Sequence, residues 1–152
     1  MKLLDSINKF VFSKRKKQGD SLLGPVLVVS NTGFGDTILS TPAIKSLRKS
    51  FLNETIIFLV NKKYAGLFIN YKYVDSIWEY SGGYLNLFLL ITKCRINNIH
   101  TIMLFHSNGP EDIFIALFSG AKNILKCSDN VNHNYKNLFQ NKLITKKQHN
   151  IE

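Results

Sequence analysis

The sequence has little cysteine, little acidic charge and no long apolar run. Cys94 and Cys127 are the only thiols, and neither a C-x-x-C motif nor a histidine at ligand spacing accompanies them. This argues against a disulfide framework or a zinc site. The longest aliphatic and aromatic stretch, 84–91, contains Asn86 and falls well short of the ~20 apolar residues of a membrane-spanning helix. The residues after Lys2 lack the unbroken apolar core of a signal peptide, so we expect a cytoplasmic chain.

Acidic residues are outnumbered two to one, and the excess of basic residues lies at the two ends. The chain has 152 residues, with 20 Lys and Arg against 10 Asp and Glu. Residues 1–20 and residues 121–152 each hold six basic and two acidic side chains, a net charge of +4. Nucleic-acid binders more often spread basic residues over a face of the folded body. A small basic nucleic-acid-binding protein therefore stays an alternative, and we expect no specific nucleic acid as a partner.

Residues 1–24 form a basic amphipathic segment and a linker. The apolar residues at positions 3, 4, 7, 10 and 11 share one face of a short helix, and the basic run 14–17 follows. Such a pattern is typical of a segment that lies on an anionic membrane surface, where each basic group contributes about 1 kcal/mol. The alternative is a helix packed on the domain with a solvated charge run after it.

The body of the chain alternates between strand and helix patterns. Buried-strand patterns occur at 26–29, 55–60, 75–80, 101–105 and 123–126. Helical spacing occurs at 37–50, 62–69, 85–96 and 112–118. This order predicts an α/β fold over residues 25–127, a Rossmann-like open, mostly parallel sheet with flanking helices. Residues 128–152 are rich in Asn and Lys, and we expect them to be a tail.

The loop after the first strand, 31–37, contains two glycines and an acid at the start of a helix. It is not a dinucleotide fingerprint, because Ile38 replaces the third glycine and Asn61 replaces the expected carboxylate after the second strand. The Walker pattern fails as well. Asp36 therefore has two interpretations. It is either a carboxylate that interacts with the helix dipole or a base that accepts a proton from a substrate hydroxyl.

The loop after the fourth strand offers polar groups at the same edge of the sheet. His106 and Asn108 carry donors and acceptors suited to sugar hydroxyls, whereas Glu111 and Asp112 are expected to begin the next helix. The chain has no Asp-x-Asp motif, so we expect no metal site and no bound cofactor.

The motif G-F-G-D-T-I-L-S-T-P-A at 33–43 resembles glycosyltransferase family 9, the family of the lipopolysaccharide heptosyltransferases. The segments 55–65, 73–77 and 117–122 and the closing Q-H-N-I-E also look like this family. The resemblance implies a GT-B fold of two Rossmann-like lobes, of which this chain is the N-terminal, acceptor-binding lobe. The implied activity is inverting transfer of heptose or a related sugar, from an ADP-heptose-like donor, to a lipopolysaccharide core or another glycolipid.

The resemblance also assigns roles to residues. Asp36 corresponds to the general base that deprotonates the acceptor hydroxyl. The other implied acceptor-binding positions are Thr32, Gly33, Gly35, Thr37, Thr41, His106 and Asn108. We expect the donor site to lie on a C-terminal domain that does not follow residue 152, so that the chain alone is inactive and a separately encoded C-terminal half is a possible partner. The expected location is the cytoplasmic face of the inner membrane. A noncatalytic module that binds glycolipid or the membrane surface is the second alternative.

Overall fold

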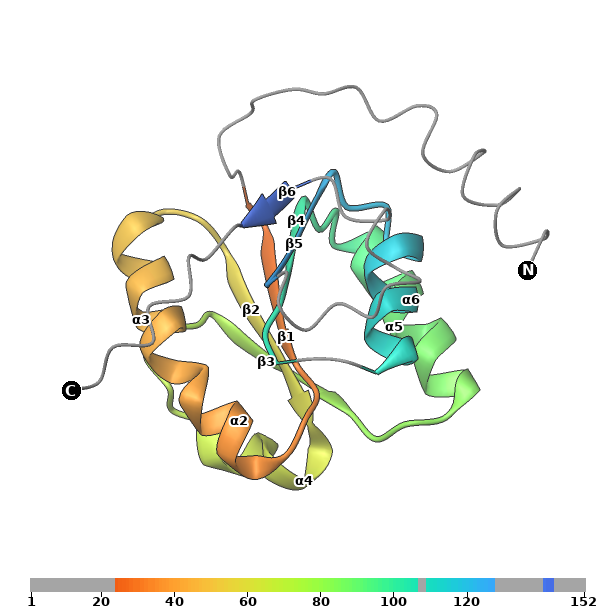
Figure 1. Cartoon of the computed structure of the whole chain (residues 1–152), viewed down its shortest axis with the longest axis horizontal. Helices are drawn as coiled ribbons and strands as arrows, with labels where there is room; N and C mark the ends of the chain where they lie inside the picture. Colours follow the sequence, from red (N-terminus) through yellow and green to blue (C-terminus); the bar gives the residue numbers. More distant parts are fainter. Residues whose placement is uncertain (1–23, 107–108, 128–140, 144–152) are drawn as a thin grey trace.

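A computed structural model of the chain describes residues 24–106, 109–127 and 141–143, which form one sheet with helices on both faces (Figure 1). The strands are β1 (Val26–Ser30), β2 (Ile56–Asn61), β3 (Ser76–Tyr80), β4 (Thr101–Leu104), β5 (Asn123–Cys127) and β6 (Asn141–Leu143). The helices are α2 (Phe34–Leu39), α3 (Thr41–Ser50), α4 (Lys62–Ala65), α5 (Tyr84–Ile96) and α6 (Pro110–Phe118), with a short 3-10 turn η1 (Gly66–Phe68) after α4.

The strand order is β3-β2-β1-β4-β5-β6, and every pairing is parallel. Within it, Val26 of β1 pairs with Ile56 of β2 on one side and with Thr101 of β4 on the other. This is the order of a doubly wound Rossmann sheet. The predicted α/β, Rossmann-like fold class is therefore confirmed.

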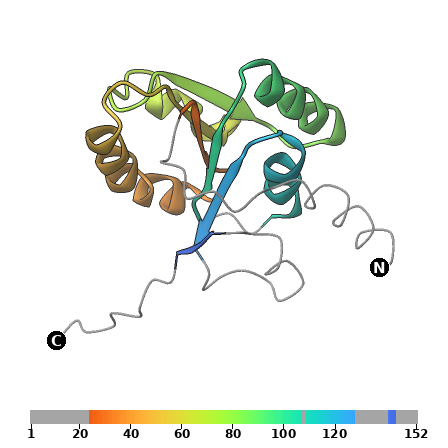
Figure 2. The same ribbon diagram turned by 90° about the horizontal axis from the view of Figure 1, so that it is seen from above.

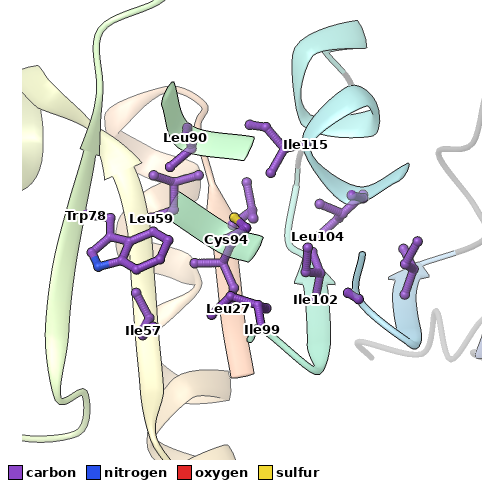
Figure 3. Packing of buried hydrophobic residues seen from close by; sticks show 14 of the residues in the cluster. Leu27, Ile57, Leu59, Trp78, Leu90, Cys94, Ile99, Ile102, Leu104 and Ile115 are labelled. Carbon is purple, nitrogen blue, oxygen red and sulfur yellow. The ribbon is translucent and has the colours of Figure 1, made fainter. Parts of the chain in front are cut away.

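Both faces of the sheet are buried, and successive residues of a strand serve opposite faces. Leu27 and Val29 of β1 belong to the core under α5 and α6, whereas Val26 and Val28 belong to the core under α3 and α4. Figure 2 shows α2 and α3 on one side of the sheet and α5 and α6 on the other. Figure 3 shows the first core around Cys94. Burial on both faces explains why β1 is an unbroken apolar run until its last residue, as expected of a central parallel strand.

The structure differs from the sequence prediction in three elements. The predicted helix 62–69 is the four-residue α4 followed by the 3-10 turn η1. The predicted helix 37–50 is two helices, because α2 begins at Phe34 and the chain turns at Ser40 before α3. The sheet also gains β6, which pairs in parallel with β5 inside the stretch expected to be tail. Three residues are too few to show a strand periodicity, so no sequence pattern predicts this strand. The predicted amphipathic segment at 1–24 lies outside the described residues except for Gly24.

Arg48 fixes the C-terminal end of α3 to the loops beside β2 and β3. Its guanidinium donates to the carbonyls of Tyr73 (3.2 Å) and Glu54 (2.9 Å) and forms an ion pair with Asp75. The Asp75 carboxylate also accepts from the backbone N–H of Ile56 at 2.7 Å. A planar guanidinium can donate to several acceptors at once. Here it joins the end of α3 to the segments that lead into β2 and β3.

Helix α5 is the longest helix of the described ranges, at 13 residues. No helix within those ranges is both long enough and apolar enough to cross a bilayer.

Candidate functional site

The sheet has a topological switch point between β1 and β4. The chain leaves β1 toward β2 on one side, and it returns to β4 on the other side only after β3 and α5. In an open α/β sheet the ligand crevice lies at such a point, outside the carboxyl ends of the strands. Figure 1 shows α2 and α4 at this edge. The two loops that the sequence singled out, after β1 and after β4, therefore meet at the position where ligands bind in this fold class.

The glycine loop after β1 is more regular than the sequence suggested. Gly33 is the N-cap of α2 with φ −64° and ψ 163°, an extended conformation open to any residue. Gly35 lies within α2, and a Cβ built on either glycine would meet no atom within 4 Å. Neither glycine has a positive φ, so the backbone conformation alone does not require glycine at either position. Because glycine has no side chain, the backbone at the start of α2 is left uncovered on its open side.

Asp36 lies in the first turn of α2, with its side chain exposed at this edge. Its carboxylate makes no hydrogen bond or ion pair with any other residue of the described ranges. A negative charge is favoured at this end of a helix, where backbone N–H groups point outward. Asp36 is therefore an accessible carboxylate with unused acceptor capacity at the mouth of the crevice.

Two buried side chains hold the turn that carries Asp36. The hydroxyl of Thr37, fully buried, donates to the carbonyl of Gly33 at 3.0 Å. Ser40, also buried, donates to the carbonyl of Asp36 at 2.9 Å and is hydrogen-bonded to the hydroxyl of Ser30 at 3.1 Å. Thr37 thus shapes the loop and presents no exposed group to a ligand. Sequence reasoning missed Ser30 and Ser40, because a serine in a strand and a serine in a helix carry no signal of their mutual contact.

Thr41 is likewise occupied within the protein. Its hydroxyl donates to the carbonyl of Ile38 at 2.8 Å, and its own carbonyl accepts from the hydroxyl of Tyr71 at 2.8 Å. It begins α3 after the turn at Ser40. The structure therefore gives Thr41 a role in joining α3 to the segment after α4.

Asn31 and Thr32, directly after β1, carry oxygen atoms without partners. The side-chain oxygens of Asn31 (Oδ1) and Thr32 (Oγ1) are buried and have no hydrogen-bond partner among the described residues. A buried acceptor without a partner is costly, and it accepts readily from a water molecule or a ligand hydroxyl. Asn31 was not among the site residues predicted from the sequence.

The loop after β4 contributes one described site residue, His106. It is exposed and adopts φ 51°, in the left-handed region that residues other than glycine rarely occupy. Asn108 lies outside the described residues. Glu111 and Asp112 begin α6 as predicted, since both lie in its first turn. The structure thus brings His106 to the same edge as Asp36 through the parallel pairing of β1 and β4.

Behind these loops lies a buried polar group that the sequence analysis did not predict. Asp112 is 1% exposed and accepts from the side-chain amide of Asn31 at 3.5 Å, which links the two loops. Lys126 of β5 is 6% exposed. Burial lowers the pKa of Lys126, and the charge of Asp112 partly offsets that effect. An acid in the first turn of a helix and a lysine in a strand are each ordinary in sequence, so only the fold reveals that they face each other.

Tyr80, at the end of β3, lies near the buried carboxylate of Asp112. Its side chain is 2% exposed, and its hydroxyl makes no hydrogen bond of standard geometry with the described residues, although the Glu111 carboxylate lies close enough to interact with it. Burial raises the pKa of Tyr80 to about 12, and the neighbouring carboxylates of Glu111 and Asp112 add to the increase. This hydroxyl is accordingly neutral over the physiological range.

Metal ligands do not gather at this edge. No group of three or more His, Cys, Asp or Glu side chains in the described part of the chain is placed to hold a metal ion. The chemistry available from the described residues is that of one exposed carboxylate, one exposed imidazole and a bare helix start.

The fold and this edge define a Rossmann-like domain with polar side chains at the switch point of its sheet. A scan of protein-family models finds no match to the sequence, and a search of curated proteins finds none either. Among solved structures, the chain is similar to the glycosyl transferase family 9 protein from Veillonella parvula DSM 2008, with a TM-score of 0.65 and 17% identity. The match covers 82% of this chain and 36% of the other, so this chain spans about a third of that protein's length. The fold likeness agrees with the family resemblance of the sequence.

Proposed function

We propose that this chain is the acceptor-binding lobe of an inverting glycosyltransferase, with Asp36 as its general base. The observation that carries the proposal is the placement of the Asp36 carboxylate, exposed and without a partner among the described residues, beside the switch point of the sheet. The fold likeness to a family 9 glycosyl transferase and the G-F-G-D motif at 33–36 support the same function.

In the proposed reaction an acceptor hydroxyl lies within hydrogen-bond distance of Asp36, roughly 2.6–3.2 Å. Its oxygen attacks the anomeric carbon of the donor sugar while its proton passes to the Asp36 carboxylate. The bond between the anomeric carbon and the nucleotide diphosphate breaks as the new glycosidic bond forms, and the diphosphate leaves with the bonding electrons. One such displacement inverts the anomeric configuration.

The local structure supports this role in two ways. The buried hydroxyls of Ser40 and Thr37 fix the turn around Asp36, so the carboxylate is held on a defined backbone. Gly33 and Gly35 leave open space over the start of α2, where a bulky sugar approaches the backbone. Positioning a reacting group in advance in this way is a large part of catalysis.

The proposed substrates follow from the family resemblance. The donor is an ADP-heptose-like nucleotide sugar, and the acceptor is a lipopolysaccharide core or another glycolipid at the cytoplasmic face of the inner membrane. Because the chain matches 36% of the length of its structural neighbour, we assign the donor site to a second lobe. That lobe would come from the rest of a longer protein or from a separately encoded half, and the lobe described here would not transfer sugar without it.

Acceptor binding is tested by titrating the isotope-labelled chain with core oligosaccharide and following backbone amide shifts. We expect shifts concentrated at residues 31–36 and at His106, with similar affinity for wild type and Asp36→Asn. Shifts confined to other parts of the sheet, or no saturable binding, would contradict the proposal. Tight, steeply salt-dependent binding of duplex DNA in a parallel titration would instead favour the nucleic-acid alternative.

A further inference from the structure

Helix α5 exposes large apolar side chains on the face opposite the core. Leu90 and Cys94 point inward and are buried, as Figure 3 shows. The outer face carries Tyr84, Leu85, Phe88, Leu89 and Ile96, which are between 64% and 92% exposed. A surface helix normally turns charged and polar residues toward water on this side. The outer face of α5, defined by these five residues, is therefore an apolar surface that lacks a partner in the described ranges.

The charges around this face have one sign. Helix α5 contains Lys93 and Arg95 in its last turn and no acidic residue. No Asp or Glu occurs anywhere between Glu79 and Glu111. An apolar stripe with cations at one end and no acid on its own helix is complementary to a surface that is apolar within and anionic outside.

We propose that the outer face of α5 docks on an anionic lipid bilayer, with the helix lying in the interface. Tyr84, Leu85 and Phe88 would enter the boundary between headgroups and acyl chains. Lys93 has its Nζ 4.2 Å from the centroid of the Trp78 ring, and Arg95 donates from Nε to the carbonyl of Phe118 at 2.8 Å. The remaining N–H groups of both side chains would lie at the level of the lipid phosphates. A second copy of this chain is a poorer occupant, because it would bring a like-charged surface to a helix that carries basic residues and no acid. The basic run at 14–17 is a poorer occupant for the same reason, because it would bring positive charge to a helix that already carries basic residues.

This docking would place the crevice beside the membrane. Helix α5 follows β3, so its N-terminal residues Tyr84 and Leu85 lie at the carboxyl edge of the sheet, the edge that holds Asp36. A lipid-linked molecule would then reach the crevice without leaving the bilayer. The inference stands on the residues of α5 and goes beyond the proposed sugar transfer, which could fail without affecting it.

The test is co-sedimentation of the full chain with vesicles that contain no glycolipid. One set is phosphatidylcholine alone, and the other is phosphatidylcholine mixed with phosphatidylglycerol. We expect binding to the anionic vesicles, weakening as salt is added. In the double variant Leu85→Ser with Phe88→Ser, the partition coefficient should fall by about tenfold or more. The matched control, Leu52→Ser with Ile69→Ser, removes exposed apolar side chains elsewhere and should bind as wild type does.

Three results would overturn the proposal. They are failure of the wild-type chain to bind anionic vesicles, undiminished binding by the α5 variant, and an equal loss in the control. Light scattering without lipid supplies a further check: a wild-type dimer that the α5 variant dissociates would make this face an interface between copies and reject the lipid assignment. If the double variant fails to fold by circular dichroism, Tyr84→Ser with Ile96→Ser, at the most exposed positions of each end, replaces it in the same assay.

Discussion

The hydroxyl of Ser40 lies 3.1 Å from the hydroxyl of Ser30 and joins the turn between α2 and α3 to the last residue of β1. Because Ser40 also donates to the carbonyl of Asp36, the proposed base is tied to the central strand through one buried side chain. The turn that looks like a simple helix break is thus a positioning element of the candidate site.

Replacing Ser40 with alanine should lower the free energy of unfolding by about 1–3 kcal/mol, since it leaves the buried Ser30 hydroxyl without this partner. Urea denaturation measures the change. Ser46→Ala, on the exposed side of α3, is the matched control and should change stability by no more than about 0.5 kcal/mol. Equal stability of Ser40→Ala and wild type would show that the contact does not hold the turn.

Alanine in place of a glycine at the start of α2 should be compatible with folding but should weaken acceptor binding. Gly35→Ala should leave the melting temperature unchanged or raise it, because alanine favours a helix by about 1 kcal/mol and its Cβ meets no atom within 4 Å. It should weaken acceptor binding by occupying the open space over α2. Gly120→Ala is the contrast, since Gly120 adopts φ 84° and alanine there should destabilise the fold by about 1–2 kcal/mol. Unchanged acceptor affinity in Gly35→Ala would argue against a ligand at this helix start.

Tyr80→Phe should be neutral or stabilising. The substitution removes a buried hydroxyl that makes no hydrogen bond of standard geometry with the described residues, and burying such a group costs about 1–3 kcal/mol. It should also change the alkaline pH dependence. The folded chain keeps the Tyr80 proton up to a pKa of about 12, whereas the unfolded chain releases it near 10, so this contribution is complete below pH 10 and is lost as the pH rises toward 12.

Denaturation of wild type and Tyr80→Phe, at neutral pH and near about pH 11, measures both effects. The decline in stability between the two conditions should be smaller in the variant. A marked loss of stability at neutral pH would mean that the hydroxyl is hydrogen-bonded after all.

Cys94 should be inert in the folded protein. Its side chain is fully buried between α5 and the sheet, and burial raises the pKa of the thiol to about 12, so almost no thiolate forms near neutral pH. In a Cys127→Ser background, Ellman's reagent should react with Cys94 only after denaturant is added. Full reaction in the absence of denaturant would indicate that α5 opens readily from the sheet.

The sequence predicted the strand and helix order well, because a central parallel strand such as β1 must be apolar on both faces and a helix such as α3 has an apolar face with helical spacing. Helix α5 is instead apolar on both its inner and its outer face. The sequence predicted less about contacts. The pairing of Ser30 with Ser40, and the burial of Asp112 and Lys126 behind the crevice, depend on how distant segments pack, which no local pattern encodes. The Gly-x-Gly spacing of the loop likewise does not determine its backbone, which is extended at Gly33 and helical at Gly35.

The central claim, that Asp36 is the general base of sugar transfer, is tested most directly by turnover of Asp36→Asn. The assay combines the chain with a donor-binding second lobe, nucleotide-heptose and core acceptor, and Glu79→Gln, an exposed carboxylate on β3, serves as the control. We predict that Asp36→Asn lowers the rate by about 10²–10⁴-fold while acceptor affinity and the activity of Glu79→Gln stay at the wild-type level. Turnover by Asp36→Asn at the wild-type rate would contradict the account.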